Sequence, residues 1–429
     1  MSILKFWSQE EPLTERLARL ALLLLLAAAA VKGIIIRFSA GYQGDELFYV
    51  REVVRLADQG FLSAVSDGIS FLYTLSGYAL SKLTGDILLG NRILSLISLA
   101  FVIHALLGIT SVMKIRQSLR WLLILTILTF AFDPRRSPFL FGINDPMLFA
   151  VFFQSLYMLT KFVFTDNARH LIYAALLLGA CFWIREISLM YLVALALPIA
   201  TWCISAKGRG IVQRFITALL FLIMVASTAV LPHIPAITTQ GTLGFEDKNY
   251  MGNWREREYL TQVRRISSGS VFAYQWIDWS EVEAYKEAGI QPPLPQNRLE
   301  ILKQDPKMVA DSFASNILIR CTYLFTLRNG LLFIVFLGAF LVLRRIRGTT
   351  GYQGWLLFSL FTLAYTLMLS AITIHRIEVR WLTPAIITMA VAAIILLDQS
   401  AQSGHKWYRP LVWGQYLFIG ASLLFNLLR

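Results

Sequence analysis

The sequence predicts an all-α polytopic membrane protein, and three observations lead to this fold class. Of the 429 residues, 57% are hydrophobic and only 15% are charged, whereas soluble domains carry about 25% charged residues. The apolar residues gather in eleven runs, most of them close to the roughly 20 residues that a transmembrane helix needs. Lys and Arg cluster at the ends of alternate runs. The cysteines are few and far apart, which predicts neither a disulfide framework nor a metal site.

About eleven transmembrane helices are expected, and the third and fifth are short enough to be tilted or broken. In chain order the candidate spans are Leu17–Ile36, Leu88–Met113, Leu119–Phe132, Pro146–Phe164, Leu171–Ile184, Leu189–Ser205, Phe215–Leu231, Ile317–Leu343, Trp355–Ile374, Leu382–Leu397 and Leu411–Leu428.

The basic side chains predict the orientation, because cytoplasmic loops are enriched in Lys and Arg. With the N-terminus inside, basic clusters fall in the inner loops near 114–120, 207–214 and 344–347. This bias also explains the net charge of +13, so we expect a lipid bilayer and no nucleic acid as partner. The predicted location is the plasma membrane, in bacteria the inner membrane.

Three parts follow from the spans: an N-terminal transmembrane module over 1–231, an extracytoplasmic loop over 232–316 and C-terminal helices over 317–429. Within the first part, residues 38–87 hold two amphipathic stretches, Leu47–Leu56 and Ile69–Leu83, which are suited to helices lying in the membrane interface.

The large loop is slightly acidic in a basic chain. A helix is expected over Ser280–Ala288, and Asp305 followed by Pro306 predicts the capped start of another helix that leads towards the eighth span.

The first candidate for chemistry is the pair Asp45 and Glu46, just past the outer end of the first span. One carboxylate could take a proton from a substrate hydroxyl while the other orients a ligand or ion. The alternative is that either residue only caps the helix that begins there. Asp145, at the outer start of the fourth span, is open to the same two interpretations.

Arginines at outer span ends form the second candidate group. They are costly near the membrane and suited to bidentate contacts with phosphate. The phosphate-binding candidates are Arg380, Arg376, Arg92 and Arg185, with His375, Glu378 and Glu186 as supporting residues. Lipid-headgroup contact by a snorkelling arginine is the competing interpretation. No zinc helix motif, phosphate-binding glycine loop or nucleophile elbow is present, which argues against a nucleotide-sugar transferase.

The order of these features resembles the GT-C superfamily of polytopic glycosyltransferases, which includes lipid A aminoarabinose transferases, protein O-mannosyltransferases and oligosaccharyltransferases. Asp45-Glu46 follows the first span, Asp145 opens the fourth, and Arg185-Glu186 separates the fifth and sixth. Arg380-Trp-x-x-Pro384 opens a late span, where Arg-Tyr is usual in the family. In contrast to larger members of the family, no large C-terminal soluble domain is expected in the sequence.

The resemblance implies a glycosyltransferase that takes a sugar from a polyprenyl phosphate, such as undecaprenyl phosphate, on the extracytoplasmic or periplasmic face. It implies Asp45 as general base, Glu46 and Asp145 as catalytic partners that orient the acceptor, and the arginines as ligands of the donor phosphate. A single displacement would invert the anomeric centre. The acceptor is a glycan, a lipid or a protein of the cell envelope. A divalent cation (Mg²⁺, Mn²⁺ or Ca²⁺) held by Glu46 and Asp145 stays open.

Three other interpretations remain. A lipid-linked glycan flippase or transporter would place charges near the membrane midplane and often carry an internal repeat. An O-antigen polymerase or ligase of another membrane fold would also use lipid-linked sugars. A non-catalytic scaffold is the third. Release of polyprenyl phosphate by the purified protein distinguishes the glycosyltransferase from the flippase and the scaffold.

Overall fold

A computed structural model describes residues 13–66, 70–134, 137–205, 210–241, 252–268, 277–290, 293–324, 330–341, 351–372 and 378–428. This described part is helical throughout and contains no strand. Seven of its helices are long and apolar enough to cross a membrane by length and composition: α1, α5, α7, α10, α18, α19 and α20. The class of all-α polytopic membrane protein is therefore supported, while the total of eleven spans stays a prediction.

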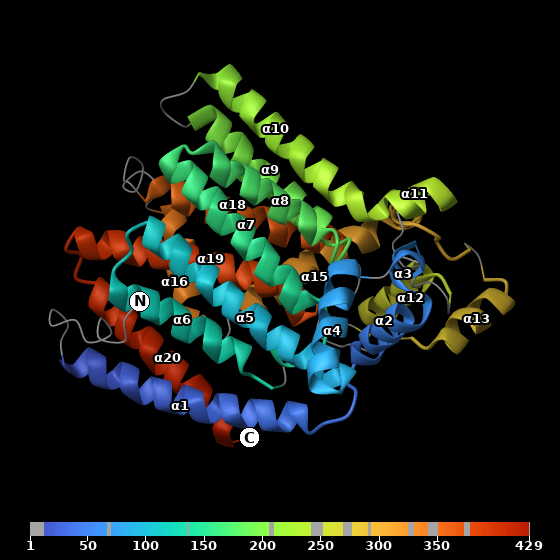
Figure 1. Cartoon of the computed structure of the whole chain (residues 1–429), viewed down its shortest axis with the longest axis horizontal. Helices are drawn as coiled ribbons and strands as arrows, with labels where there is room; N and C mark the ends of the chain where they lie inside the picture. The colour runs from blue at the N-terminus through green and yellow to red at the C-terminus, as the bar shows by residue number, and fades with distance from the viewer. Residues whose placement is uncertain are drawn as a thin grey trace.

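The N-terminal half runs from a long first helix through three short helices into six packed ones (Figure 1). Its helices are α1 (Leu13–Phe38), α2 (Glu46–Gln59), α3 (Phe61–Ser66), α4 (Phe71–Thr84), α5 (Ile87–Val112), α6 (Gln117–Ala131), η2 (Pro138–Leu140), α7 (Asp145–Thr165), α8 (Ala168–Cys181), α9 (Ser188–Ser205) and α10 (Ile211–Val230).

The C-terminal half begins with short helices outside the bundle and returns to it with α15. Its helices are η3 (Leu231–His233), α11 (Ile234–Gln240), α12 (Trp254–Ser267), α13 (Trp279–Glu287), α14 (Arg298–Gln304), α15 (Pro306–Leu324), α16 (Gly330–Leu341), α18 (Tyr352–Ile372), α19 (Val379–Gln402) and α20 (Tyr408–Leu428).

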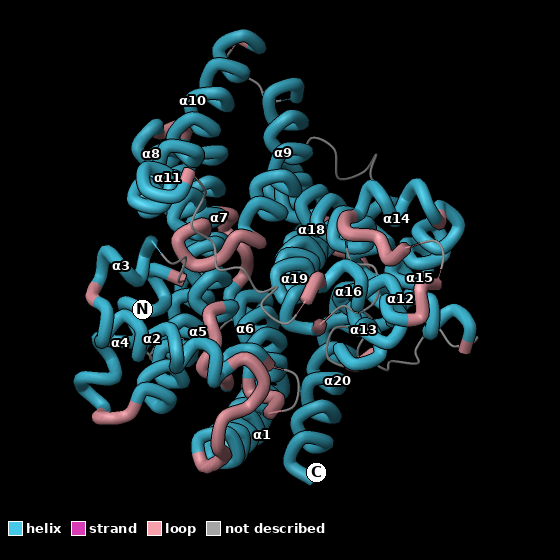
Figure 2. Tube along the Cα trace, turned by 90° about the vertical axis from the view of Figure 1, so that its right-hand side faces the viewer, coloured by secondary structure: helices cyan, strands magenta, loops and turns pink. Residues whose placement is uncertain are grey.

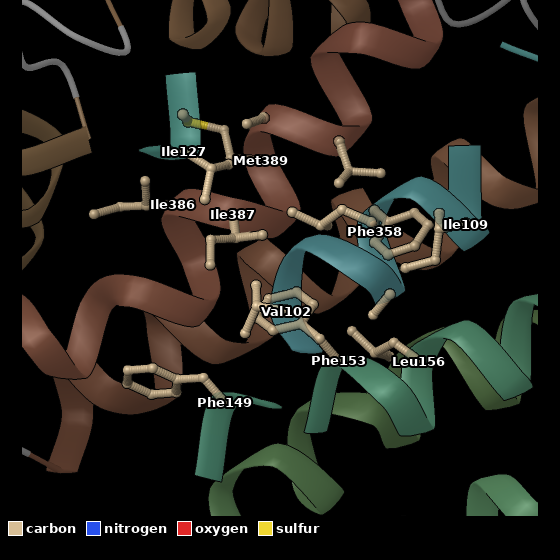
Figure 3. Close-up of a cluster of buried hydrophobic side chains, with 14 of the residues drawn as sticks. Val102, Ile109, Ile127, Phe149, Phe153, Leu156, Phe358, Ile386, Ile387 and Met389 are labelled. Atoms are coloured by element: carbon tan, nitrogen blue, oxygen red, sulfur yellow. The ribbon is translucent and has the colours of Figure 1, made fainter. Parts of the chain in front are cut away.

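The core is built around α19, whose residues from Leu382 to Asp398 are all buried. Figure 3 shows aliphatic and aromatic side chains of α5, α6, α7 and α18 meeting those of α19, among them Val102, Phe153, Phe358 and Ile387. A span enclosed by other spans is apolar on all sides, which matches the segment from Leu382 to Leu397, where Thr383 and Thr388 are the polar residues.

Helices α1 and α20 pack side by side and run in the same direction. Glu15 lies near Arg409 at one end, and Nζ of Lys32 donates to the carbonyl of Leu427 at 2.8 Å near the other. Successive spans alternate in direction, so parallel first and last spans imply an odd total number of spans. The predicted total of eleven is compatible with this arrangement.

Several local predictions are confirmed. The two stretches of residues 38–87 form the helices α2 and α4, and the loop helix expected over Ser280–Ala288 is α13, one residue earlier. Oδ1 of Asp305 accepts from the backbone N–H of Met308 at 2.9 Å, so it caps α15, which begins at Pro306.

The eighth predicted span, Ile317–Leu343, is two described helices, α15 and α16, and α15 begins well before the apolar run. Arg320, which lies within the predicted span, is fully buried on α15 and donates to the carbonyls of Thr366 at 2.7 Å and Leu369 at 2.5 Å. Arg320 therefore joins α15 to the C-terminal part of α18.

All the predicted site residues in the described part lie at one end of the bundle, where α1 ends and α5, α7 and α19 begin. We call it the site end. It is at the right of Figure 1, and Figure 2 looks onto it with α2–α4 on one side and α12–α14 on the other. The basic cluster predicted for an inner loop at 344–347 lies outside the described residues.

Candidate functional site

A cavity of about 450 Å³ opens at the site end. Its wall comes from four separate segments: 43–45 after α1, residues between 137 and 143 before α7, Tyr323 of α15, and 378–380 at the start of α19. Polar groups line one part of it, while Pro138, Phe141 and Ile143 make an apolar part. Asp45, from the first predicted motif, and Arg380, from the last, therefore line the same cavity.

Arg380 is the centre of the polar wall. Its Nη2 lies 2.7 Å from Oδ2 of Asp45, its Nη1 lies 3.4 Å from Oδ2 of Asp145, and its Nε pairs with Glu378. The side chains of Asp45 and Glu378 are 47% and 38% exposed, whereas that of Asp145 is 2% exposed. Asp45 is therefore the carboxylate of this group that a substrate reaches most readily.

Asp45 occupies the N-cap position of α2, but its side chain makes no capping hydrogen bond there. Asp145 is equally engaged elsewhere, since its Oδ1 accepts from Nη1 of Arg185 at 2.6 Å. Both carboxylates are held in place by guanidiniums.

Arg185, in the connection between α8 and α9, forms an ion pair with Asp145. Although burial disfavours its charge, the neighbouring carboxylates, Asp145 foremost and also Glu186 and Asp45, hold the pKa of Arg185 above its ordinary value. Glu186 itself is exposed. The pair of Arg185 and Asp145 is therefore a fixed part of the wall.

Glu46 and Arg92 form a separate, buried ion pair. Nε and Nη2 of Arg92 donate to the two Glu46 oxygens at 2.9 and 2.8 Å, and both side chains are at most 2% exposed. Glu46 also accepts from the backbone N–H of Gln43 and of Gly142, while Arg92 donates to the carbonyls of Ala40 and Gly41. These contacts give both residues a positioning role for the segment that carries Asp45.

An uncharged network positions Asp145 and Arg185 from the side of α2. The hydroxyl of Tyr49 donates to Oδ1 of Asn144 at 2.7 Å, and Nδ2 of Asn144 donates to Ser70 Oγ and to the carbonyl of Ile184. Burial raises the pKa of Tyr49 well above its ordinary value, so Tyr49 stays a neutral donor. Asn144 and Ile184 precede Asp145 and Arg185 in the chain, so this network fixes both charged residues.

The remaining predicted residues, His375 and Arg376, lie outside the described residues. Sequence reasoning missed Gln43, Ser137 and Tyr323, which line the cavity, and Arg37, which contacts its wall. Arg37 carried a signal that could have found it, because a positive charge at an outer span end runs against the positive-inside bias. The other three carry no such signal.

Within the described segments, no group of three or more His, Cys, Asp or Glu side chains is arranged to hold a metal ion. The two expected ligands, Glu46 and Asp145, are each bound by an arginine. A cation at either carboxylate would have to displace that arginine.

Two comparisons of the sequence with known proteins find no relative. No protein-family model matches the sequence, and a search of curated proteins finds no match. The functional interpretation therefore depends on the geometry of the site end.

Proposed function

We propose that this protein is an integral membrane glycosyltransferase that moves a sugar from a polyprenyl phosphate to an acceptor hydroxyl at the extracytoplasmic face. One observation carries the proposal: a cavity of about 450 Å³ is lined together by Asp45, Glu378 and Arg380. A half-exposed carboxylate beside a guanidinium combines a proton acceptor with positive charge, which the transfer of a sugar from a phosphate requires.

In the proposed reaction, the acceptor oxygen attacks the anomeric carbon while its proton passes to Asp45. The bond from this carbon to the phosphate oxygen breaks, and its electron pair leaves with the polyprenyl phosphate. Arg380 fixes one oxygen of Asp45 and faces the same cavity, so the donor phosphate would dock against it. The displacement inverts the anomeric centre.

Burial of the surrounding pairs supports this assignment. Asp145 with Arg185, and Glu46 with Arg92, hold segments of the wall in place, and such preorganisation reduces the rearrangement needed during reaction. The ionisable residues of the wall gather at the site end rather than at mid-bundle, which favours an enzyme over a transporter with a midplane site.

The test uses purified protein in bilayer nanodiscs with labelled undecaprenyl-phospho-sugars. We expect release of undecaprenyl phosphate that depends on an added envelope fraction as acceptor. The Asp45→Asn variant should release little. Donor that stays intact with every sugar and acceptor fraction, while flipping between leaflets is observed, would replace the proposal by the flippase alternative.

A further inference from the structure

Arg37, in the last turn of α1, lies directly behind the cavity wall. Its Nη1 donates to Oε1 of Gln43, its Nε donates to the carbonyl of Pro134 at 2.5 Å, and its guanidinium carbon lies 4.1 Å from the ring centre of Phe141. Gln43 and Phe141 both line the cavity. One side chain therefore separates Arg37 from the space that a ligand would fill.

Arg37 makes no direct ion pair with a described carboxylate, although Glu46 and Asp133 lie near it. Among the described residues no carboxylate oxygen lies within 4 Å of its nitrogens, whereas Arg92, Arg185 and Arg380 each pair with one or more. Three carboxylates surround Arg380, and one of them is shared with Arg185. Among the described side chains of that cluster, carboxylates thus outnumber guanidiniums by one, which favours a further cation for an anion that enters the cavity.

The depth of Arg37 fits a lipid phosphate. It ends a helix of 26 residues whose outward face is apolar, with Leu24, Val31 and Ile35 between 58% and 66% exposed. An arginine at the end of an apolar span reaches the level of lipid headgroups. The phosphate of a prenyl-linked donor lies at this level when its chain is in the bilayer.

We propose that Arg37 binds the phosphate of the lipid-linked donor as a second cation, beside Arg380. The exposed side chain of Gln43 turns away, and the phosphate oxygens take its place as acceptors from the guanidinium. This inference rests on the proposed function, and it assigns the phosphate to a residue outside the predicted set.

Binding of labelled undecaprenyl phosphate to the full-length protein in nanodiscs tests the proposal, with undecaprenol as the probe that lacks the phosphate. In Arg37→Gln we expect the Kd for undecaprenyl phosphate to rise at least about tenfold, as for the loss of a hydrogen bond to a charged group, and the Kd for undecaprenol to stay unchanged. Arg120→Gln is the matched control. Arg120 is also half-buried and donates through Nε to a backbone carbonyl, that of Ile115, at the opposite end of the bundle.

Gln43→Glu tests the same point in a chain that keeps Arg37. The new carboxylate would pair with the guanidinium and compete with the phosphate, so affinity should fall in this variant too. Competition with inorganic phosphate and with phosphatidylglycerol separates a site for the prenyl-linked phosphate from a general anion or headgroup site.

Wild-type affinity for undecaprenyl phosphate in both variants would overturn the role of Arg37 and leave the proposed function standing. Equal competition by phosphatidylglycerol would overturn it as well. A wild-type protein that binds undecaprenol as tightly as undecaprenyl phosphate would remove both the inference and the proposed function.

Discussion

Arg380 donates to Asp45 at 2.7 Å although 335 residues separate them in the chain. The contact joins the start of α19, the most buried helix, to the short segment between α1 and α2. A carboxylate fixed at one oxygen can present the other in a constant direction to a ligand. The geometry of the candidate base is therefore set by the last third of the chain.

Asp45→Asn should retain the fold and lose the reaction. Asn keeps the size of the side chain but cannot take up a proton, and the loss for a general base is on the order of 10²–10⁴-fold. Folding should survive because Asp45 makes no capping bond. The measurement is sugar transfer at equal expression. Near-normal transfer would move the role of base to another carboxylate of the wall.

Arg380→Lys should impair the site despite keeping the charge, because an ammonium lacks the planar fork that contacts Asp45, Asp145 and Glu378 together. We expect a lower kcat and weaker binding of undecaprenyl phosphate. Donor binding and melting temperature are measured on the same sample. Normal donor binding with a lowered melting temperature would restrict Arg380 to a structural role.

Glu46→Gln should destabilise the protein, because it leaves Arg92 buried without its carboxylate. Breaking a buried ion pair from one side costs about 3–5 kcal/mol. Glu281→Gln is the matched control, since Glu281 pairs with Arg264 at the surface, and its melting temperature should change little. Equal melting temperatures for the two variants would contradict the structural role of Glu46 and return it to the list of catalytic partners.

The site end should face the outside of the cell. In a background with the three native cysteines replaced by alanine, Ser280→Cys should react with an impermeant thiol reagent in spheroplasts. Ser403→Cys, equally exposed after α19, should react only after lysis. The reverse pattern would invert the orientation and place the cavity in the cytoplasm.

Sugar transfer should persist after treatment with EDTA, because arginines already occupy Glu46 and Asp145. The check is the transfer rate before and after chelation, with the same samples resupplied with Mg²⁺, Mn²⁺ or Ca²⁺. An EDTA-sensitive rate that one of these ions restores would contradict this expectation and direct attention to the more exposed Asp45 and Glu378.

Local sequence signals predict the start of a helix well where the interactions that fix it involve only neighbouring residues. Asp305 and Pro306 mark the start of α15 because capping involves only the next turn. The pairing of Glu46 with Arg92 was not predictable, since the sequence offers many acids and bases and does not say which of them meet. A hydropathy profile likewise does not show that the guanidinium of Arg320 donates hydrogen bonds to carbonyls of another helix.

The candidate site likewise contains residues that a local sequence signal marks and residues that it does not. Asp45, Asp145 and Arg380 stood out because charged side chains at the outer ends of apolar spans are costly near the membrane. Tyr323 and Gln43 have no such mark, since any polar residue near a membrane surface resembles them in sequence. They become part of the cavity only through the packing of α15 and the course of the segment after α1.

The contact between Lys32 and Leu427 also has a consequence for biogenesis. Lys32 enters the membrane with the first helix, yet its acceptor lies 395 residues later, which at ordinary rates of synthesis takes roughly 20 to 80 seconds. Throughout that interval the nascent chain carries an ammonium group that its final neighbour does not yet cover. Synthesis of α20 therefore completes the surroundings of a charged residue that was inserted with the first helix.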